Sequence, residues 1–211
     1  MNMTITKLGW FCLLIAIVGE VLVPFILAPF YKGYSHTTMA ISALGNSSSP
    51  VRVSFNLWML VAGVLLLLST PSIYNLYSET SKALSAITVL FIGIFAIGAC
   101  IFTCFFSVGE TREIVTSASK IHGAGSAIGF MLMLFVPLFI AILSFKAEDK
   151  FVGVIAVISF VLALVFFVLF IMADKPQFQN TVIAKEGLWQ RLNLLFMYVP
   201  LAFVAMTRIR S

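Results

Sequence analysis

Three titratable side chains in this apolar chain could carry acid–base chemistry: Glu20, His36 and His122. Glu20 lies about halfway along the first long apolar run, where an ionised carboxylate in hydrocarbon costs roughly 2.5 to 3.5 kcal/mol. It must therefore face protein or water, become protonated, or pair with a cation. Four roles fit that position: a neutral acid in one interhelical hydrogen bond, a proton carrier, a metal ligand, or the partner of Arg191 or a histidine.

His122 begins a segment rich in small residues, with the sequence HGAGSAIG over 122–129. In a helix, His122, Ser126 and Gly129 fall on one side, so the imidazole is expected to face packed protein. Gly125 and Gly129 have the spacing that lets membrane helices approach each other closely. A histidine in this place can be either a hydrogen-bonded structural group or a ligand.

A metal site or an acid–base pair would require the two histidines to meet Glu20 or Glu110. The chain contains no H-x-x-x-H or H-E-x-x-H spacing, so we predict no metal site and leave the cofactor unknown. Glycine-rich phosphate loops and nucleophile elbows are also missing from the sequence. Whether the protein is an enzyme stays open, and three serines are candidate nucleophiles only because they lie near a histidine: Ser35, Ser42 and Ser126.

Other polar side chains could hold the polar part of a ligand. Asn56 begins the second apolar run, and Trp189 has the position of an interfacial anchor. Arg191 either extends outward or faces the bundle, where it could pair with a carboxylate or bind a lipid phosphate. The predicted substrate-binding residues are Ser35, Ser42, Asn56, Glu110, Trp189 and Arg191.

The composition of the chain shows that these polar residues must lie within or beside a membrane-spanning domain. Hydrophobic residues make up 61% of the chain and charged residues only 10%, with a mean hydropathy of +1.10. Because soluble domains contain about 25% charged residues, we expect an integral membrane protein with membrane lipids as partners. The net charge of +5 comes from basic residues scattered singly between apolar runs, a pattern typical of membrane topology, so no nucleic-acid partner is predicted.

Six apolar runs are long enough to cross the hydrocarbon core. Since a spanning segment must satisfy its own backbone polar groups, we predict one all-α transmembrane domain over 1–211. It is a six-helix bundle with both termini on the same side, and its oligomeric state is not predicted. The expected spans are about 8–30, 53–71, 84–106, 123–144, 151–173 and 189–207.

The distribution of Lys and Arg favours termini in the cytoplasm of a prokaryotic cell, with the domain in the cytoplasmic membrane. The three longer connections, 31–52, 107–122 and 174–188, then lie outside. The first is expected to contain a short helix or re-entrant turn, with Ser35 as its N-cap and Gly45 at its end.

Several short motifs in this order resemble the DUF998 family of uncharacterised prokaryotic membrane proteins. They are Tyr34-Ser35, SALG at 42–45, Pro50, Phe55-Asn56, Gly63, His122 at the start of its span, and GLWQR at 187–191. More distantly, ISALG at 41–45 with Pro50 and IHGA at 121–124 is similar to the Frag1/DRAM/Sfk1 group of six-span proteins.

These resemblances imply a six-helix bundle whose matched residues lie on the non-cytoplasmic side, with a role related to lipids. They imply no mechanism, and they supply candidate positions without roles: Ser42, Gly45, Asn56, His122 and Arg191. Gln190 stands where an acid beside the arginine would be expected, which argues against an ion pair there.

Together these observations predict a polar pocket on the non-cytoplasmic side that binds or processes a lipid or another amphiphile. Arg191 and Asn56 would hold the headgroup, while Glu20, His36 and His122 would tune protonation or perform acid–base chemistry. Two alternatives remain. One is a small proton-coupled transporter that uses Glu20, and the other is a non-catalytic membrane scaffold or sensor subunit.

Overall fold

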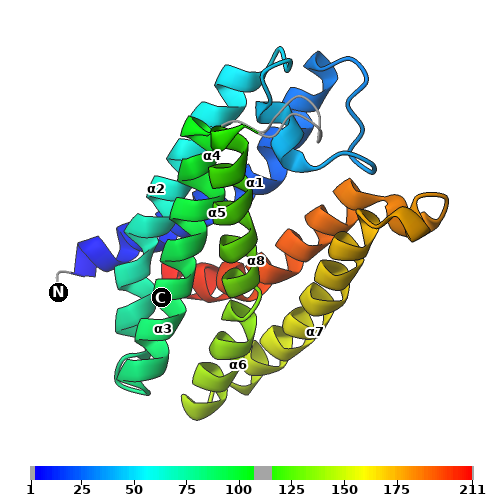
Figure 1. The fold of residues 1–211 in the computed structure, drawn as a ribbon. Helices are drawn as coiled ribbons and strands as arrows, with labels where there is room; N and C mark the ends of the chain where they lie inside the picture. Colours follow the sequence, from blue (N-terminus) through cyan, green and yellow to red (C-terminus); the bar gives the residue numbers. More distant parts are fainter. Residues whose placement is uncertain (1–2, 107–115, 211) are drawn as a thin grey trace.

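A computed structural model describes residues 3–106 and 116–210, and within these ranges all regular secondary structure is helical (Figure 1). Six of its helical segments are long and apolar enough to cross a membrane, as the sequence predicts, and the chain is an integral membrane protein. The segments are Lys7–Phe30, Arg52–Tyr77, Lys82–Phe105, Ser117–Lys146, Lys150–Ala173 and Glu186–Arg210.

The helices follow the sequence in a simple order. They are α1 (Met3–Leu27), α2 (Arg52–Tyr77), α3 (Lys82–Phe95), α4 (Phe102–Phe105), α5 (Ser117–Met133), α6 (Val136–Lys146), α7 (Lys150–Ala173) and α8 (Glu186–Arg210). Four short 3-10 segments lie in the connections: Ala28–Phe30, Ile41–Gly45, Pro176–Phe178 and Val182–Ala184.

Two of the six spans are irregular. The third consists of α3, a π-helical segment Ala96–Ile101 and α4, so its last turns are offset relative to a regular α-helix. The fourth is interrupted at 134–135, between α5 and α6. Pro137 explains this break, because it has no N–H to donate to the carbonyl of Met133.

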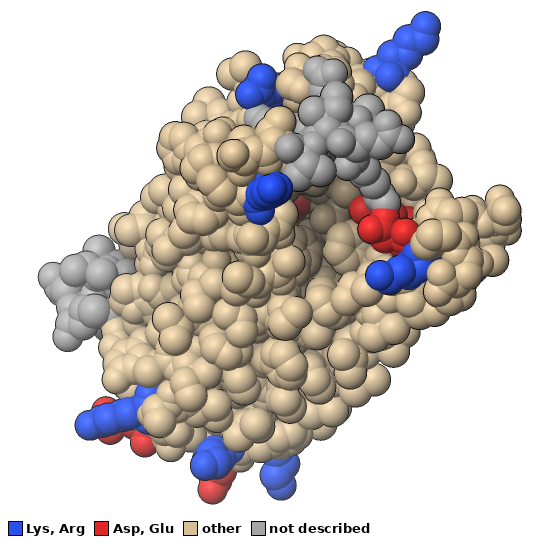
Figure 2. All heavy atoms as spheres, in the orientation of Figure 1, with Lys and Arg blue, Asp and Glu red and all other residues tan. Residues whose placement is uncertain are grey.

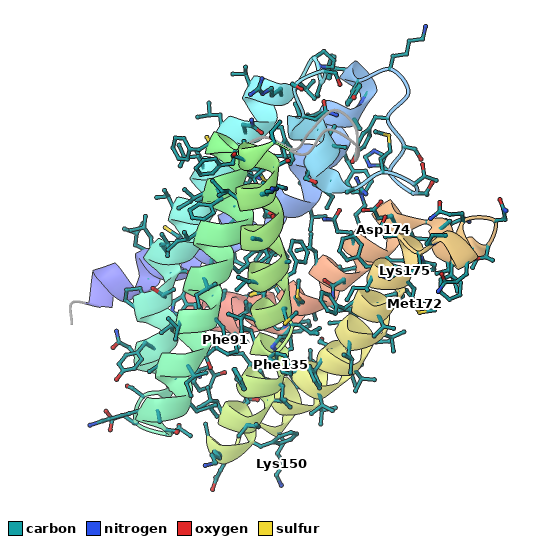
Figure 3. The ribbon with its side chains drawn as sticks, in the orientation of Figure 1. Phe91, Phe135, Lys150, Met172, Asp174 and Lys175 are labelled. Atoms are coloured by element: carbon teal, nitrogen blue, oxygen red, sulfur yellow. The ribbon has the colours of Figure 1, made fainter. Side chains whose placement is uncertain are left out.

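The outer surface of the bundle fits a hydrocarbon environment. On the face seen in Figure 2, charged atoms gather toward opposite ends and an uncharged belt lies between them. α7 crosses this belt from Lys150 at one end to Asp174 and Lys175 at the other (Figure 3). Its outward side chains are apolar and exposed, as expected where lipid tails replace water.

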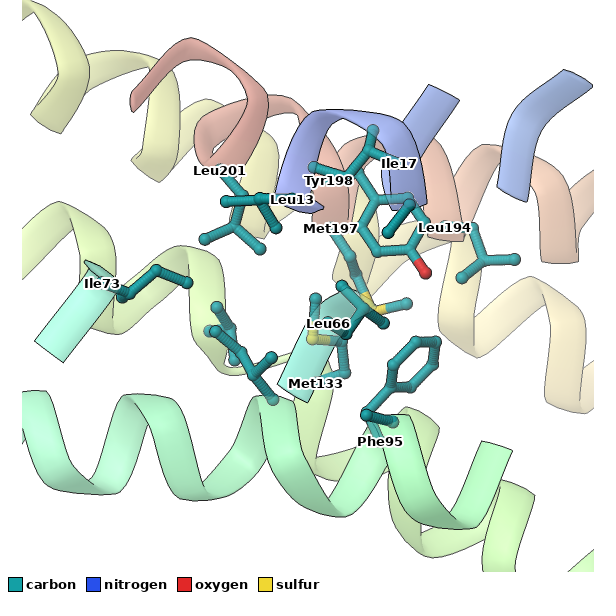
Figure 4. Packing of buried hydrophobic residues seen from close by; sticks show 14 of the residues in the cluster. Leu13, Ile17, Leu66, Ile73, Phe95, Met133, Leu194, Met197, Tyr198 and Leu201 are labelled. Atoms are coloured by element: carbon teal, nitrogen blue, oxygen red, sulfur yellow. The ribbon is translucent and has the colours of Figure 1, made fainter. Parts of the chain in front are cut away.

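The buried apolar core draws residues from α1, α2, α3, α5, α6, α7 and α8, and Figure 4 shows part of it. Leu13, Leu66, Phe95 and Met197 are fully or almost fully buried there. Near the end of the bundle opposite residues 31–51, the hydroxyls of Tyr77 and Ser144 lie 3.0 Å apart and join α2 to α6. Apolar contact and a few buried hydrogen bonds therefore hold the bundle together.

Small residues allow α5 to approach the π-helical segment closely. A Cβ added to Gly125 would lie 2.9 Å from the carbonyl oxygen of Gly98 and 2.9 Å from a ring carbon of Phe102. A Cβ added to Gly123, two residues earlier in α5, would meet nothing within 4 Å. The close contact thus depends on Gly125 and not on glycine content in general.

We expect Gly125→Ala to lower the free energy of unfolding by about 1–3 kcal/mol, because the added methyl forces α5 away from Gly98. Gly123→Ala is the matched control and should be neutral or stabilising by about 0.5–1 kcal/mol, since alanine is the better helix former. Thermal unfolding of the purified protein in detergent measures both effects. Equal melting temperatures for the two variants would contradict the close packing of α5.

Candidate functional site

The connection 31–51 folds back over the bundle in short turns. The Ser35 hydroxyl accepts a hydrogen bond from the N–H of Thr38 at 3.3 Å, so Ser35 caps a turn, and the 3-10 helix begins at Ile41. Gly45 ends that helix, and a Cβ there would lie 2.9 Å from the Phe55 ring. Where the sequence predicts a short helix or a re-entrant turn from Ser35 to Gly45, the structure has a turn followed by a 3-10 helix.

Arg191 on α8 holds this connection in place. Its Nη1 donates to the carbonyl oxygens of His36 at 2.7 Å, Met39 at 3.3 Å and Gly187 at 2.8 Å. Its Nη2 donates to the hydroxyl of Tyr34, and the guanidinium also lies over the Tyr34 ring, 5.8 Å from its centroid. The positive charge is thus surrounded by carbonyl dipoles and one aromatic ring.

Two neighbours on α8 complete the attachment. The N–H of Leu188 donates to the carbonyl of Thr37 at 3.0 Å, and the side-chain oxygen of Gln190 accepts from the N–H of Ile41 at 2.7 Å. An acid at position 190 is not needed, because the bond required there is a backbone N–H to a neutral oxygen. The start of α8 and the connection 31–51 therefore form one hydrogen-bonded unit.

His36 belongs to this unit, apart from the cavity described below. Its ring stacks on Phe25 with centroids 4.5 Å apart and meets the Tyr34 ring edge-on at 5.4 Å. Partial burial, and then the positive charge of Arg191, hold the pKa of His36 below its usual value. Burial also raises the pKa of Tyr34, while Arg191 opposes that rise.

A cavity of about 330 Å³ lies beneath this unit, between α5, α7 and the start of α8. In Figure 1 α5 and α7 diverge toward this end of the molecule, and Figure 2 shows a hollow there with acidic atoms on its rim. The aromatic rings of Phe130 on α5 and Phe170 on α7 stack 6.3 Å apart at its wall. Its polar lining residues are Glu20, Ser42, Thr103, His122, Ser126, Glu186 and Gln190.

The hydrogen bonds around His122 determine which of its nitrogens carries the proton. The hydroxyl of Thr103 donates to the carbonyl of Ala99 at 2.6 Å and lies 3.3 Å from His122 Nδ1. Since the only hydrogen of that hydroxyl is already used, Nδ1–H must be the donor to Thr103. The neutral imidazole then carries its lone pair on Nε2. His122 is buried and lines the cavity with a proton acceptor.

Glu20 is 9% exposed and also lines this cavity. The Trp58 indole and the Tyr198 hydroxyl lie close enough to interact with its carboxyl group. Even so, Glu20 Oε1, Trp58 Nε1 and the Tyr198 hydroxyl are buried atoms that make no hydrogen bond to any described residue. Three polar groups thus gather at one point in an apolar bundle with unused hydrogen-bonding capacity.

A second cavity of about 270 Å³ lies between α1 and α8. Glu20, Ile41 and Leu194 line both cavities, so the carboxyl group of Glu20 stands at their junction. Pro24 on the same helix has no N–H, which leaves the backbone carbonyl of Glu20 without its usual helical donor. At Glu20 the first span thus has both an ionisable side chain and a backbone carbonyl without its usual helical hydrogen bond.

The predicted site residues separate into four groups. Glu20, Ser42 and His122 line the first cavity, and Arg191 lines the second. Four others lie elsewhere: Ser35 in its turn, His36 on Phe25, Asn56 buried beneath Gly45, and Trp189 donating to the carbonyl of Ile183 at 2.9 Å. Glu110 lies outside the described residues.

Sequence reasoning missed four residues of this region: Trp58, Thr103, Gln190 and Tyr198. Trp58 and Tyr198 count as apolar bulk in a hydropathy pattern, and Thr103 is a single hydroxyl within an apolar run. Only Gln190 gave a signal, as a departure from the acid expected beside Arg191. Among the described residues no cluster of three or more His, Cys, Asp or Glu could hold a metal ion.

Comparison with known families adds one finding. The family model described as a protein of unknown function (DUF998) matches residues 14–207. The chain belongs to the DUF998 family. No curated protein and no solved structure matches it. The DUF998 match includes Glu20, the connection 31–51, His122 and Arg191, so both cavities lie within the part of the chain that defines the family.

In this DUF998 protein we expect Arg191→Lys to lower the free energy of unfolding by about 1.5–3 kcal/mol, because one ammonium cannot reach acceptors that two guanidinium nitrogens hold. Tryptic cleavage after the exposed Lys32 should also accelerate. Arg210→Lys is the matched control, since it makes the same change at an exposed position at the end of α8. Unchanged stability of Arg191→Lys would show that the connection does not depend on the guanidinium.

Proposed function

We propose that this protein binds a single-chain lipid or a similar amphiphile in the cavity between α5 and α7, with the polar group of the ligand at Glu20 and His122. One observation carries the proposal: Glu20, whose Oε1 is buried without a hydrogen-bond partner among the described residues, lines a cavity whose other walls are mostly apolar and aromatic. Sites of this composition, with few polar groups in an apolar wall, are the usual form of small-ligand pockets.

The size of the cavity restricts the ligand. At about 30 Å³ per water molecule, 330 Å³ is the space of about eleven waters. This volume accepts one alkyl chain of moderate length or a compact amphiphile, and it is too small for a whole two-chain phospholipid. The proposal therefore concerns a free single-chain amphiphile or one chain of a larger lipid.

The surroundings of the cavity favour entry from the membrane. Met131 on α5 and Ile171 on α7 line it and are 53% and 47% exposed. Apolar side chains at a mouth between two spans would allow an alkyl chain to pass directly from the hydrocarbon phase. In the orientation that the positive-inside pattern favours, this mouth opens to the outer leaflet.

Chemistry on the bound ligand is an extension of the proposal. His122 Nε2 can accept a proton, and the hydroxyls of Ser42 and Ser126 line the same cavity. These are the parts of an acid–base site without a defined nucleophile. We therefore propose binding as the function, and acyl or phosphoester turnover as the first reaction to test.

Binding predicts that chain-labelled probes react inside the cavity. We propose photolabelling in lipid nanodiscs with sixteen-carbon amine, alcohol and carboxylic acid probes that carry a diazirine in the chain. Labelling of α5 and α7 peptides that excess unlabelled amphiphile suppresses is expected for at least one headgroup. Ala127→Phe, which fills the lining, should reduce this competable labelling several-fold.

Ile128→Phe is the matched control, because it adds the same ring one residue later at a side chain that is 54% exposed and outside the lining. Its labelling should equal that of the unmodified protein. If no probe gives competable labelling, binding is excluded, and the scaffold interpretation takes its place.

A second candidate function is proton-coupled transport. The observation that favours it is the position of Glu20 at the junction of two cavities on different sides of α8. A carboxyl group there could exchange a proton with a substrate as access alternates. The absence of a recognisable inverted repeat in the sequence counts against it.

Transport predicts proton movement across liposomes that trap the pH dye pyranine. Decyltrimethylammonium serves as the probe, because its permanent charge prevents it from carrying protons itself. The imposed pH gradient should collapse when the probe is added, Glu20→Gln should abolish the effect, and the exposed control Glu79→Gln should retain it. Equal rates for Glu20→Gln and the unmodified protein would rule out this function.

A further inference from the structure

We propose that the ligand carries a positive charge: an ammonium group, attached to an alkyl chain, that binds between Glu20 and the aromatic rings around it. This inference rests on the proposed function and deepens it by naming the headgroup. It differs from the anionic headgroup expected from the sequence, where Arg191 was the anchor.

The charges along the first cavity support a cation. Its described lining residues include the carboxyl groups of Glu20 and Glu186, and no Lys or Arg is among them. The one imidazole is His122, whose Nδ1–H is directed to Thr103 and whose other nitrogen is an acceptor. An anionic headgroup would thus find hydroxyl and amide donors but no Lys or Arg among the described lining residues, whereas an ammonium group would find two carboxyl groups.

Arg191, the only Lys or Arg among the described residues that line the second cavity, already uses both terminal nitrogens of its guanidinium. Three carbonyl oxygens and the Tyr34 hydroxyl accept its hydrogen bonds. A phosphate or carboxylate that took the place of these acceptors would detach the connection 31–51, and only the Nε of Arg191, which is buried and makes no hydrogen bond to a described residue, is left for an anion. The residue most suited to an anion is therefore used to build the roof of the site.

The aromatic rings near Glu20 also favour an ammonium ion. Trp58 and Tyr198 lie against its carboxyl group, and the Phe95 ring, which lines the cavity, meets the Tyr198 ring edge-on with centroids 6.2 Å apart. Aromatic faces attract cations and add little to the binding of anions. A carboxylate among aromatic rings is a recurrent means of binding amines.

The unpartnered atoms complete the argument. Glu20 Oε1 is buried and makes no hydrogen bond of ordinary geometry to a described residue, so it can accept one from an N–H donor, in competition with the Trp58 N–H and the Tyr198 hydroxyl that lie beside the same carboxyl group. A cation at this point would compensate the cost of a carboxylate in the membrane interior, because each charge would have its counterpart. A neutral headgroup would leave that cost in place unless Glu20 were protonated.

The test uses Trp58 as a reporter beside Glu20. In the variant Trp10→Phe/Trp189→Phe, Trp58 is the only tryptophan, and N-dodecylpyridinium is a cationic amphiphile whose headgroup quenches indole fluorescence. We expect saturable quenching in an uncharged detergent. The variant Trp10→Phe/Trp58→Phe, which retains Trp189 alone, is the control and should show only non-saturable quenching. Neither indole lines the cavity, but Trp58 lies beside Glu20, which does, whereas Trp189 stacks on Phe166.

Competition then identifies the charge and its source. Decyltrimethylammonium should displace the pyridinium probe, and decyl sulfate at ten times the concentration should not. Displacement by lysophosphatidylethanolamine would assign the ammonium to a lipid headgroup, whereas displacement by decylamine alone would assign it to a free amine. Glu20→Gln, which keeps the hydrogen-bonding capacity but removes the charge, should weaken pyridinium binding at least tenfold.

The outcomes distinguish this inference from the function on which it rests. If decyl sulfate displaces the probe as well as the cation does, or if Glu20→Gln binds as tightly, the charge assignment is wrong while binding stands. If no quenching saturates and the photolabelling also fails, both proposals fail. The headgroup competition needs no substitution at Glu20, so it decides the question even if Glu20→Gln does not fold.

Discussion

The guanidinium of Arg191 is the interaction on which the architecture of this end of the molecule depends. It brings residues 34–39 and the first turns of α8 together across more than 150 positions of sequence, through bonds to backbone carbonyls and one phenol. Because the carbonyl dipoles compensate its charge, no acid is required beside it. The connection 31–51 then becomes a fixed roof, and the space beneath it remains open between α5, α7 and α8.

Most of the fold could be predicted from the sequence, because the hydrocarbon core imposes one requirement on every span. Length and hydropathy gave the six spans and their helical form, and short motifs gave the DUF998 family. The interior irregularities could not be predicted in the same way. Pro137 explains the break in the fourth span once it is seen, but nothing in the run from Ala96 to Ile101 distinguishes a π-helical segment from an α-helix.

The site was predictable only in part, for a physical reason. Glu20 and His122 attract attention because an ionisable group in hydrocarbon needs compensation, and they do line the same cavity. Arg191 attracts attention for the same reason, yet a sequence does not reveal whether its compensation comes from a ligand or from distant backbone carbonyls. Trp58 and Tyr198 give no signal, since their polar atoms are minor parts of large apolar side chains. The roles of all these residues remain proposals.

The break at 134–135 divides the fourth span into two helices, α5 and α6. Below it, α6 is held to α2 by the paired hydroxyls of Tyr77 and Ser144. Above it, α5 carries one wall of the cavity and is separated from α6 by a backbone with an incomplete hydrogen-bond ladder, where bending costs less than within a continuous helix. Any tilt of α5 relative to α6 would change the distance between α5 and α7 at the cavity, and the close approach of Gly125 to Gly98 opposes such a tilt.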